Sequence, residues 1–295
     1  MNASEWMLPI LQERQPLLPL DSKIRPKFQL LDGLRAIIFD IYGTLIVSGS
    51  GDVGSVDQTD RSQVIQRAMQ FVGVEERLDR PVMWCDLRRV IERMNAERKS
   101  DDCISPEIDV VAAWRRVVDE HGWTAEEQDV ATLVRLATYF EAWANPTWPM
   151  PGASDLIHRL SSSEIALGII SNAQVFTPLL VEDLLFSEKN RPPVFQPDLC
   201  FFSNRFRHSK PGPRLFNALA NALQRRGILP QEALYVGNDM LNDVWGASQV
   251  GMRTAWFAGD RRSQRRRSSD PRCCELSPDL VLTSLPQLLE CLKLP

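Results

Sequence analysis

Short apolar runs that alternate with amphipathic stretches organise most of this sequence. The first run, Ala36-Ile37-Ile38-Phe39, is continuously apolar, which is typical of a strand buried on both faces of a parallel sheet. Similar runs recur towards the C-terminus, separated by segments with helical spacing of apolar residues. The predicted strands are 36–39, 166–170, 199–202, 233–236, 253–257 and 280–282. The predicted helices among them are 153–160, 179–185, 213–223, 242–249 and 285–292. This alternation predicts an α/β fold with a parallel sheet and right-handed crossovers.

A different pattern fills residues 48–148. Four stripes of apolar residues have helical spacing, and we find no convincing strand between them. The stripes are 64–69, 83–94, 110–118 and 130–144. The pattern predicts an all-helical unit inserted directly after the first strand.

The segments that flank this unit are rich in turn-forming residues. Residues 48–54 contain glycine and serine, and residues 145–152 contain three prolines and a glycine, so we interpret both as hinges. The predicted α/β core, a Rossmann-like parallel sheet, therefore comprises residues 34–47 and 149–295. Residues 1–33 form an N-terminal extension whose four prolines interrupt any period, and we expect it to pack on the surface of the core.

Composition and charge narrow the class of protein. Of the 295 residues, 44% are hydrophobic and 24% are charged, as in an ordinary globular protein, and the net charge is -4. We therefore expect neither nucleic acid nor an anionic membrane as a partner. No apolar window is long enough for a transmembrane helix, and the N-terminus lacks a basic leader with an apolar core. The six cysteines form no C-x-x-C pair, which favours reduced thiols in a cytoplasmic protein.

Polar residues at the predicted strand ends carry the candidate chemistry. Asp40 follows the first strand, Ser171 the second and Asp239 the fourth, with Lys210 after the third and Asp243 one helical turn beyond Asp239. In a parallel α/β sheet these ends converge on one crevice. A carboxylate nucleophile, a hydroxyl, an ammonium and an acidic pair suit attack on an anionic, electrophilic centre. Asp239 and Asp243 are hard oxygen ligands that suit Mg²⁺. Taken alone, each residue has a plain structural alternative, such as a turn cap for Asp40.

The motifs at these four positions resemble those of the haloacid dehalogenase superfamily of hydrolases. They are FDIYGT at 39–44, ISN at 170–172, KP at 210–211 and GNDMLND at 237–243. The resemblance covers roughly residues 34–290. It implies that the helical unit at about 48–148 is a cap of the type placed directly after the first motif.

The resemblance assigns roles to the residues of the first three motifs. Asp40 is the expected nucleophile, and Ser171 and Lys210 are expected to hold the transferred group. Asn172 and Thr44, which belong to the same motifs, are expected to contact the substrate.

The resemblance also implies a magnesium site. In the family, the acids of the fourth motif position Mg²⁺, which here would be Asp239 and Asp243 beside the nucleophile Asp40. The backbone carbonyl of Tyr42 is a further expected ligand in phosphatase members. Asn238 stands where either an acid or an amide occurs, so the ligand is Asn238 or Asp239.

One residue departs from the phosphatase pattern. Phosphatase members usually carry a general acid/base aspartate two residues after the nucleophile, and here that position is Tyr42. A carboxyl group typically contributes about 10²–10⁴-fold by protonating the leaving alkoxide, and tyrosine, with a reference pKa of about 10, is a poor substitute. The Asp-x-Tyr-Gly-Thr form is similar to 2-haloacid dehalogenases, in which Asp attacks carbon and halide departs without needing a proton or a metal.

Three hypotheses follow. The favoured one is a Mg²⁺-dependent phosphatase that acts on a small anionic, phosphorylated metabolite through an aspartyl-phosphate, with Tyr42 among its catalytic residues. The second is a metal-independent 2-haloacid dehalogenase, in which a cap arginine binds the substrate carboxylate. The third is a catalytically weak member that binds a phosphorylated ligand or partner, with the five arginines of 261–267 as an anion-binding flap instead of a solvated loop. The candidate cap arginines are Arg61, Arg67, Arg88 and Arg115.

Overall fold

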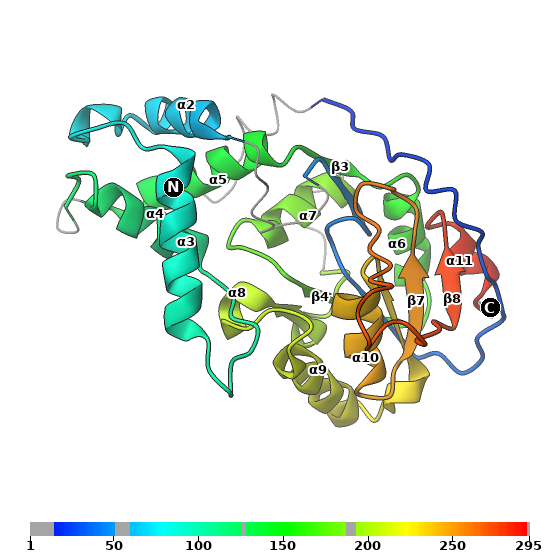
Figure 1. The fold of residues 1–295 in the computed structure, drawn as a ribbon. Coiled ribbons are helices and arrows are strands. Elements are labelled where there is room, and N and C mark those ends of the chain that lie inside the picture. The colour runs from blue at the N-terminus through cyan, green and yellow to red at the C-terminus, as the bar shows by residue number, and fades with distance from the viewer. Residues whose placement is uncertain (1–14, 51–59, 125–127, 187–192, 294–295) are drawn as a thin grey trace.

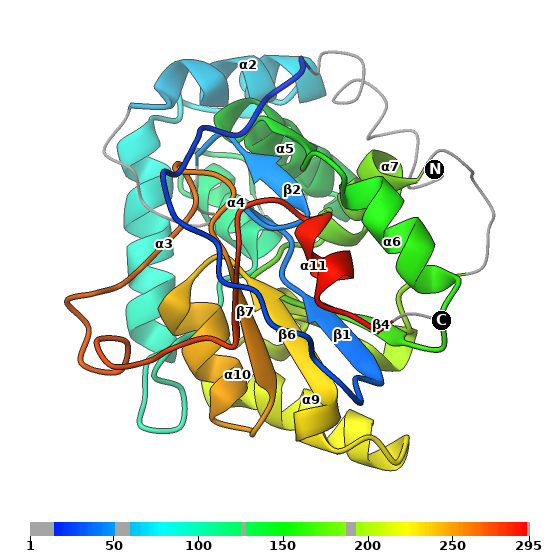
Figure 2. The same cartoon turned by 90° about the vertical axis from the view of Figure 1, so that its right-hand side faces the viewer.

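A six-stranded parallel sheet forms the centre of the protein. The computed structural model describes residues 15–50, 60–124, 128–186 and 193–293. The order across the sheet is β5-β4-β1-β6-β7-β8 (Figures 1 and 2), so the predicted α/β fold is confirmed. The strands are β1 (Ala36–Phe39), β4 (Ala166–Ser171), β5 (Cys200–Phe202), β6 (Ala233–Gly237), β7 (Arg253–Phe257) and β8 (Leu280–Leu282).

The topology places the end of β1 at the centre of the sheet. The chain runs from β1 outward through β4 to β5, then returns to the other side of β1 and continues through β6 and β7 to β8. Phe39 of β1 is in register with Ile169 of β4 and Val236 of β6, so the three strands end at the same level. In an open α/β sheet, ligands bind outside the carboxyl ends of the strands, where the strand order reverses. Asp40 lies at this position.

Helices cover both faces of the sheet because β1 buries alternate side chains on opposite faces. Ile37 and Phe39 belong to the larger hydrophobic cluster, on the face of α6 and α7. Ala36 and Ile38 pack with the apolar side of α9. The helices of the core are α6 (Ala153–Ser161), α7 (Thr177–Leu185), α8 (Ser203–Phe206), α9 (Pro213–Arg225), α10 (Gly246–Ser248) and α11 (Gln287–Glu290).

Four helices that lie between β2 and β3 in the sequence form a separate layer, on the left in Figure 1. They are α2 (Ser62–Val72), α3 (Trp84–Arg98), α4 (Val110–Asp119) and α5 (Val130–Ala144). α5 packs on α2 and α4, and α4 also packs on α3. Asp109 and Asp129 cap the N-termini of α4 and α5 by accepting hydrogen bonds from backbone N–H groups, as short polar residues do at this position. The apolar stripes meet in a buried core around Trp114 and Leu136.

The two segments expected to be hinges are joined to each other in the structure. β2 (Ile46–Ser48) pairs antiparallel with β3 (Thr147–Pro149), a ribbon that the sequence did not predict. Asn145 Oδ1 accepts a hydrogen bond from Ser48 Oγ at 2.7 Å and from the backbone N–H of Ser50 at 3.1 Å. The predicted hinge residues 51–54 lie outside the described residues. The described parts of the two connections between the sheet and the helical layer therefore pair with each other.

The described part of the N-terminal segment follows the edge of the sheet. Lys27 forms an isolated antiparallel bridge with Val281 of β8, and Leu31 pairs with Leu292. Covering an edge strand in this way blocks pairing with another chain. In Figure 2 the same segment, in dark blue, runs over the strands towards the loop after β7. Leu20 accepts a hydrogen bond from Arg261 N–H and donates one to Asp260 Oδ1, which ties that loop to the N-terminal segment.

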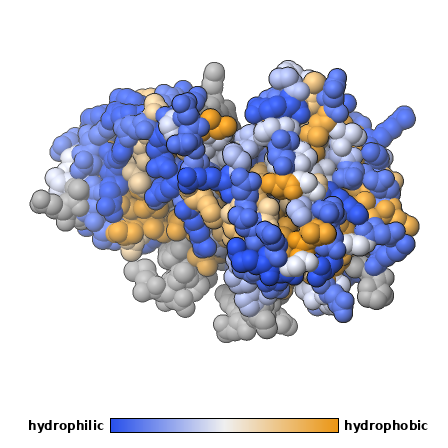
Figure 3. Space-filling view, turned by 90° about the horizontal axis from the view of Figure 1, so that it is seen from below, coloured by the Kyte–Doolittle hydropathy of each residue, from blue (hydrophilic) through white to orange (hydrophobic). Residues whose placement is uncertain are grey.

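Several element boundaries differ from the sequence prediction. The helix expected at 242–249 begins at Met240, as a π-helical turn (Met240–Trp245) followed by α10, because the Asp239 carboxylate caps its first N–H groups. The closing helix is only Gln287–Glu290. Among the described residues, no helix has the length and apolar character to cross a membrane. Figure 3 shows a mostly hydrophilic face with smaller hydrophobic areas over both the helical layer and the sheet.

Candidate active site

Nearly all the polar residues predicted at the strand ends gather in one crevice. Asp40, Ser171, Lys210, Asp239 and Asp243 all line it, and each is buried. Its remaining lining residues are Tyr42, Asn172, Asn238, Asn242, Ser263 and Arg265. Of the predicted substrate contacts, Thr44 is placed differently: it is fully buried behind the crevice, where its hydroxyl donates to Asn238 Oδ1 at 3.5 Å.

Lys210 is the centre of a buried charge cluster. Its Nζ donates to Asp40 Oδ1 at 2.8 Å and to Asp243 Oδ1 at 2.6 Å. Tyr235, which the sequence analysis counted only as a strand residue, places its hydroxyl 3.1 Å from the same Nζ. Its single O–H proton has two acceptors within reach, Ile170 O at 2.8 Å and Asp243 Oδ1 at 3.2 Å. The ammonium therefore holds the nucleophile candidate Asp40 in one orientation, at the end of β1.

The electrostatics of the cluster show a shortage of positive charge. Burial raises the pKa of Asp243 to about 7; Lys210 opposes this, but the nearby carboxylates of Asp40 and Asp239 add to it. Burial alone would lower the pKa of Lys210, but Asp243 and Asp40 outweigh it and raise that pKa. Burial, with the Asp243 charge, raises the pKa of Tyr235 well above its ordinary value, so its hydroxyl stays a donor.

Asn172 and a glycine fix the backbone of the site. The Asn172 side-chain oxygen accepts a hydrogen bond from the Lys210 N–H at 2.8 Å, and its amide nitrogen lies 3.5 Å from the Lys210 carbonyl oxygen. Gly43 has a φ of +79°, in the left-handed region that favours glycine, and a Cβ there would lie 2.5 Å from Ser263 Cβ. The turn after Asp40 can therefore close tightly against the loop that follows β7.

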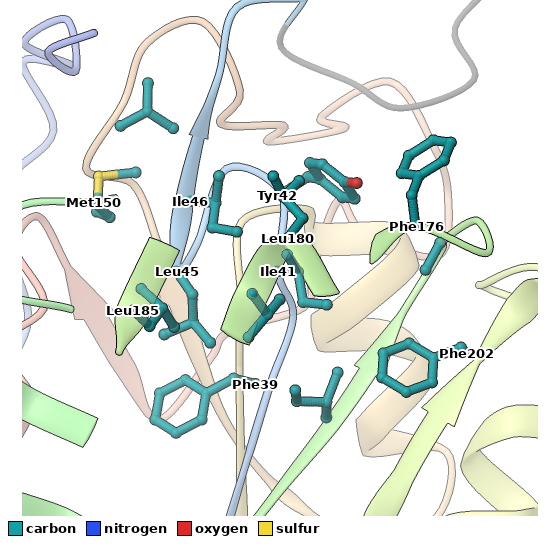
Figure 4. Close-up of a cluster of buried hydrophobic side chains, with 14 of the residues drawn as sticks. Phe39, Ile41, Tyr42, Leu45, Ile46, Met150, Phe176, Leu180, Leu185 and Phe202 are labelled. Carbon is teal, nitrogen blue, oxygen red and sulfur yellow. The ribbon is translucent and has the colours of Figure 1, made fainter. Parts of the chain in front are cut away.

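Tyr42 lies at the wall of the crevice with its hydroxyl already engaged. The phenol oxygen is 3.0 Å from Thr177 Oγ1 at the start of α7. Figure 4 shows the ring beside Leu180, at the edge of a cluster of buried apolar side chains that includes Phe39 and Phe176. This packing, together with a reference pKa of about 10, makes the Tyr42 hydroxyl a poor proton donor for a leaving group.

The arginine-rich loop is not simply solvated. Ser263 is fully buried, and it lines the crevice together with Arg265. The Arg267 guanidinium contacts Asp239, with Nη2 2.6 Å and Nε 3.1 Å from Oδ2. Arg261 and Arg266 are exposed, as the solvated-loop interpretation expects. The clustering of five arginines in seven residues was the only signal in the sequence, and it did not indicate which of them reaches the site.

A second cavity, of about 300 Å³, opens beside the crevice. Asn172 and Asn242 line both spaces. The wall on the side of the helical layer is largely apolar and includes Trp84 and Phe140, whereas polar groups from both parts of the protein line the remainder. Of the four candidate cap arginines, Arg61 lines this cavity, and its guanidinium carbon is 5.5 Å from the centroid of the Trp84 ring.

Glu107 is a half-buried titratable group in the wall of this cavity. Burial raises its pKa to about 7, against the opposing effects of hydrogen bonds from Ser203 and Gln174 and of the charge of Arg207. Gln174 Nε2 donates to its Oε1 at 3.0 Å. The folded protein thus keeps a proton that the unfolded chain, with an ordinary pKa of 4.5, releases.

The change Glu107→Gln is expected to stabilise the protein only at higher pH. The pKa of Glu107 is about 7 in the folded protein and 4.5 in the unfolded chain. Between these pH values the unfolded chain releases the proton more readily, so the folded state loses stability as the pH rises, and glutamine removes that loss. At about 1.4 kcal/mol per pKa unit, the expected gain is roughly 2–3 kcal/mol at pH 8 and close to zero at pH 4.5. Urea denaturation of both proteins at the two pH values measures it. An equal difference at both pH values would contradict this prediction.

The predicted magnesium ligands supply suitable donors, but protein cations and N–H groups hold them. Asp40, Asp239 and Asp243 offer the carboxylate oxygens that Mg²⁺ prefers. Asp243 Oδ1 accepts from Lys210, its Oδ2 accepts from the Asp239 N–H at 2.9 Å, and Asp239 is paired with Arg267. Within the described parts of the chain, no three acidic, histidine or cysteine side chains are arranged to hold a metal ion. The donor chemistry fits Mg²⁺, and in the present arrangement Arg267 is the partner of the Asp239 carboxylate.

The sequence matches the haloacid dehalogenase-like hydrolase family over residues 34–251. The chain belongs to this family. The match includes the helical layer and every crevice residue except Ser263 and Arg265. The family is one of hydrolases, so this chain is a hydrolase. The resemblance stated from the four motifs is thereby confirmed, whereas the role of each site residue stays a prediction.

Two characterised relatives of this hydrolase are phosphatases. The phosphoglycolate phosphatase of Escherichia coli K12 is 23% identical over 278 residues, which cover 90% of this chain and 94% of that protein. The glyceraldehyde 3-phosphate phosphatase of Pyrococcus furiosus is 38% identical, but over 84 residues, so the match spans 28% of this chain and only 32% of the relative. Among solved structures, a 2-haloacid dehalogenase from Pseudomonas syringae pv. Tomato DC3000 is similar with a TM-score of 0.57, at 21% identity, over 88% of this chain and 97% of that one. This last similarity shows the shared fold.

Proposed function

We propose that this hydrolase is a Mg²⁺-dependent phosphatase that acts on a small phosphorylated metabolite through an aspartyl-phosphate at Asp40. The observation that carries the proposal is the buried cluster in which Lys210 bonds both Asp40 and Asp243 at the carboxyl end of β1. The similarity to a phosphoglycolate phosphatase along 90% of the chain supports phosphate chemistry. A cytoplasmic location is part of the proposal, supported by the six free cysteines.

The proposed reaction has two displacements at phosphorus. An Asp40 carboxylate oxygen forms a bond to phosphorus while the bond from phosphorus to the ester oxygen breaks. The leaving group departs as an alkoxide, which takes a proton from water, or as a phenolate. Water then attacks the aspartyl-phosphate, which releases phosphate and restores Asp40. Lys210 and Ser171, which line the crevice, would bind the phosphoryl oxygens and stabilise the charge that develops there. A Mg²⁺ ion held by Asp40, Asp239, Asp243 and the Tyr42 carbonyl would neutralise phosphate charge when bound.

The second cavity is the proposed site for the organic part of the substrate. This cavity of about 300 Å³ adjoins the crevice, because Asn172 and Asn242 line both of them. The apolar wall formed by Trp84 and Phe140 favours a carbon skeleton, and the Arg61 guanidinium adds a partner for a second anionic group. The helical layer would then act as a cap that selects the substrate.

A 2-haloacid dehalogenase is the second candidate, and Tyr42 is the observation that favours it. The phenol is held by Thr177, and a departing halide requires no proton. Arg61 would bind the carboxylate of the haloacid in that case. A member that only binds a phosphorylated ligand is the third candidate, supported by the missing acid and by Arg265 in the crevice wall.

A hydrolysis screen separates the three candidates. The purified protein would be assayed with p-nitrophenyl phosphate, acetyl phosphate and 2-chloropropionate, each with Mg²⁺ and with EDTA. Phosphate release that requires Mg²⁺ is the expected result. Chloride release that is insensitive to EDTA would favour the dehalogenase, and binding of phosphate without any turnover would favour the third candidate.

The change Tyr42→Asp is expected to increase hydrolysis of alkyl phosphates more than hydrolysis of aryl phosphates. An aspartate at this position supplies the proton that an alkoxide needs, and such a group typically contributes about 10²–10⁴-fold. p-Nitrophenolate leaves without protonation, so its release is expected to change much less. The measurement is the ratio of kcat/KM for an alkyl phosphate to that for p-nitrophenyl phosphate, with Tyr42→Asn as the control of equal size. A ratio that is the same for the two variants would contradict the prediction.

A further inference from the structure

We propose that Arg267 and a divalent cation are alternative partners of Asp239, so that the loop 260–267 sets the affinity of the site for metal. This inference rests on the metal site of the proposed function. It identifies Arg267 as a residue that acts on the metal site through Asp239. Replacement of the Arg267 guanidinium by the metal ion would make the Asp239 carboxylate available as a metal ligand.

The contact between Arg267 and Asp239 engages both oxygens of the carboxylate that the proposed metal site uses. Nη2 and Nε of Arg267 lie 2.6 and 3.1 Å from Oδ2, and Nε is also 3.2 Å from Oδ1. Oδ1 in addition accepts the N–H groups of Leu241 and Asn242 at the start of the helix. A two-point guanidinium–carboxylate contact is strong and directional. While it persists, both oxygens of this carboxylate accept hydrogen bonds from the guanidinium.

The backbone positions the loop for this contact. Arg265 N–H donates to Asn238 O at 2.9 Å, and Met240 N–H donates to Arg265 O at 2.8 Å, so the loop pairs with the chain on both sides of Asp239. Arg267 itself has a φ of +51°, a sparsely populated region for a residue with a side chain, which persists only where the surroundings fix it. The backbone conformation of the loop therefore directs the Arg267 guanidinium towards Asp239.

The charges of the cluster favour exchange over joint binding. Asp40, Asp239 and Asp243 carry three negative charges when ionised, and Lys210 offsets one of them. A divalent cation would balance the remaining two, whereas Arg267 balances only one. A metal ion bound beside an Arg267 that stays in place would add repulsion between two cations at the same carboxylate.

The Arg267 guanidinium is more exposed than the carboxylate it contacts, so it is the partner that can move away from Asp239 into solvent. The Arg267 side chain is 36% exposed, whereas that of Asp239 is 8% exposed. Ser268 and Ser269, which follow in the loop, are exposed. Lys210, by contrast, is buried between two carboxylates, so metal binding is expected to displace Arg267 and not Lys210.

The test is a titration of the metal-free full-length protein with Mn²⁺, followed by the electron paramagnetic resonance signal of free Mn²⁺. Arg267→Gln is expected to lower the Kd for Mn²⁺ by about 10- to 100-fold relative to the unchanged protein, because a hydrogen-bonded charged competitor is removed. Arg266→Gln, which removes the same charge from the exposed neighbouring position, is the matched control and is expected to leave Kd within about twofold. Arg267→Lys, which keeps the charge but loses the two-point contact, is expected to lie between.

The remaining outcomes would overturn either the exchange between Arg267 and the metal or the metal site itself. An equal or higher Kd in Arg267→Gln would overturn the exchange proposal while the metal site stands. Equal decreases in Arg267→Gln and Arg266→Gln would also overturn it, because general charge and not the contact would then be responsible. No Mn²⁺ binding by any variant, with thermal denaturation showing that all are folded, would overturn the metal site itself and the inference with it. Phosphate release that persists in EDTA would then show that only the Mg²⁺ dependence of the proposed function fails, whereas no phosphate release under either condition would count against the phosphatase itself.

Discussion

Asp40→Asn is expected to lower kcat for phosphate ester hydrolysis by about 10⁴–10⁶-fold, the range typical for loss of a covalent nucleophile. The amide cannot attack phosphorus to form the intermediate, although it has the size of the carboxylate. The fold should persist, because Lys210 keeps its contacts with Asp243 and Tyr235. Phosphate release from p-nitrophenyl phosphate measures the loss.

The matched control for this change is Asp279→Asn. Asp279 is a half-buried aspartate whose Oδ2 accepts a hydrogen bond from the N–H of Thr254, near the start of β7 and at the opposite end of the sheet from the crevice. This variant should lose stability but retain kcat. Activity in Asp40→Asn above about one hundredth of the unchanged protein would show that Asp40 is not the nucleophile, since loss of a nucleophile costs far more.

Lys210→Met is expected to lower the free energy of unfolding by about 3–5 kcal/mol, the cost of leaving buried charge without its partner. Methionine has a similar length but no charge, so Asp40 and Asp243 would face each other without compensation. The Lys210 side chain is only 3% exposed, which leaves little water to replace the ammonium. Urea denaturation measures the loss.

A double variant distinguishes charge from packing. In Lys210→Met/Asp243→Asn, one of the two carboxylates is neutral, so part of the lost stability should return. A double variant that is less stable than Lys210→Met by the full cost of Asp243→Asn alone would mean that the two residues act independently. The buried pair would then not be the source of the destabilisation.

Strand β1 and the site at its end were predictable because the apolar run of the strand and the alternation of strands and helices along the chain indicate the same fold. Ala36 to Phe39 is apolar without interruption, and a strand buried on both faces is the structure that such a run favours. The parallel topology then brings Asp40, Ser171 and Asp239 to one edge, whatever their separation along the chain. The nucleophile candidate and the crevice were therefore accessible from sequence, as was the helical layer with its regular apolar stripes.

The residues that the sequence did not indicate act through long-range contacts. Tyr235 lies inside an apolar strand, and only the placement of β6 beside β1 turns its hydroxyl towards Lys210. Arg267 is one of five arginines in a loop, and a backbone bridge between Arg265 and Asp239 selects it. The ribbon of β2 and β3 is equally non-local, since it joins segments about one hundred residues apart whose glycine and proline content favours loops.

Rapid acid quenching followed by peptide mass spectrometry shows whether Asp40 carries the phosphoryl group during turnover. The enzyme would be mixed with acetyl phosphate and Mg²⁺, quenched during turnover and digested. We expect one added phosphoryl group on the peptide that contains Asp40, and no such group in Asp40→Asn. Steady release of phosphate with no phosphorylated peptide at any quench time, or with the group on another residue, would show that hydrolysis does not proceed through an aspartyl-phosphate at Asp40.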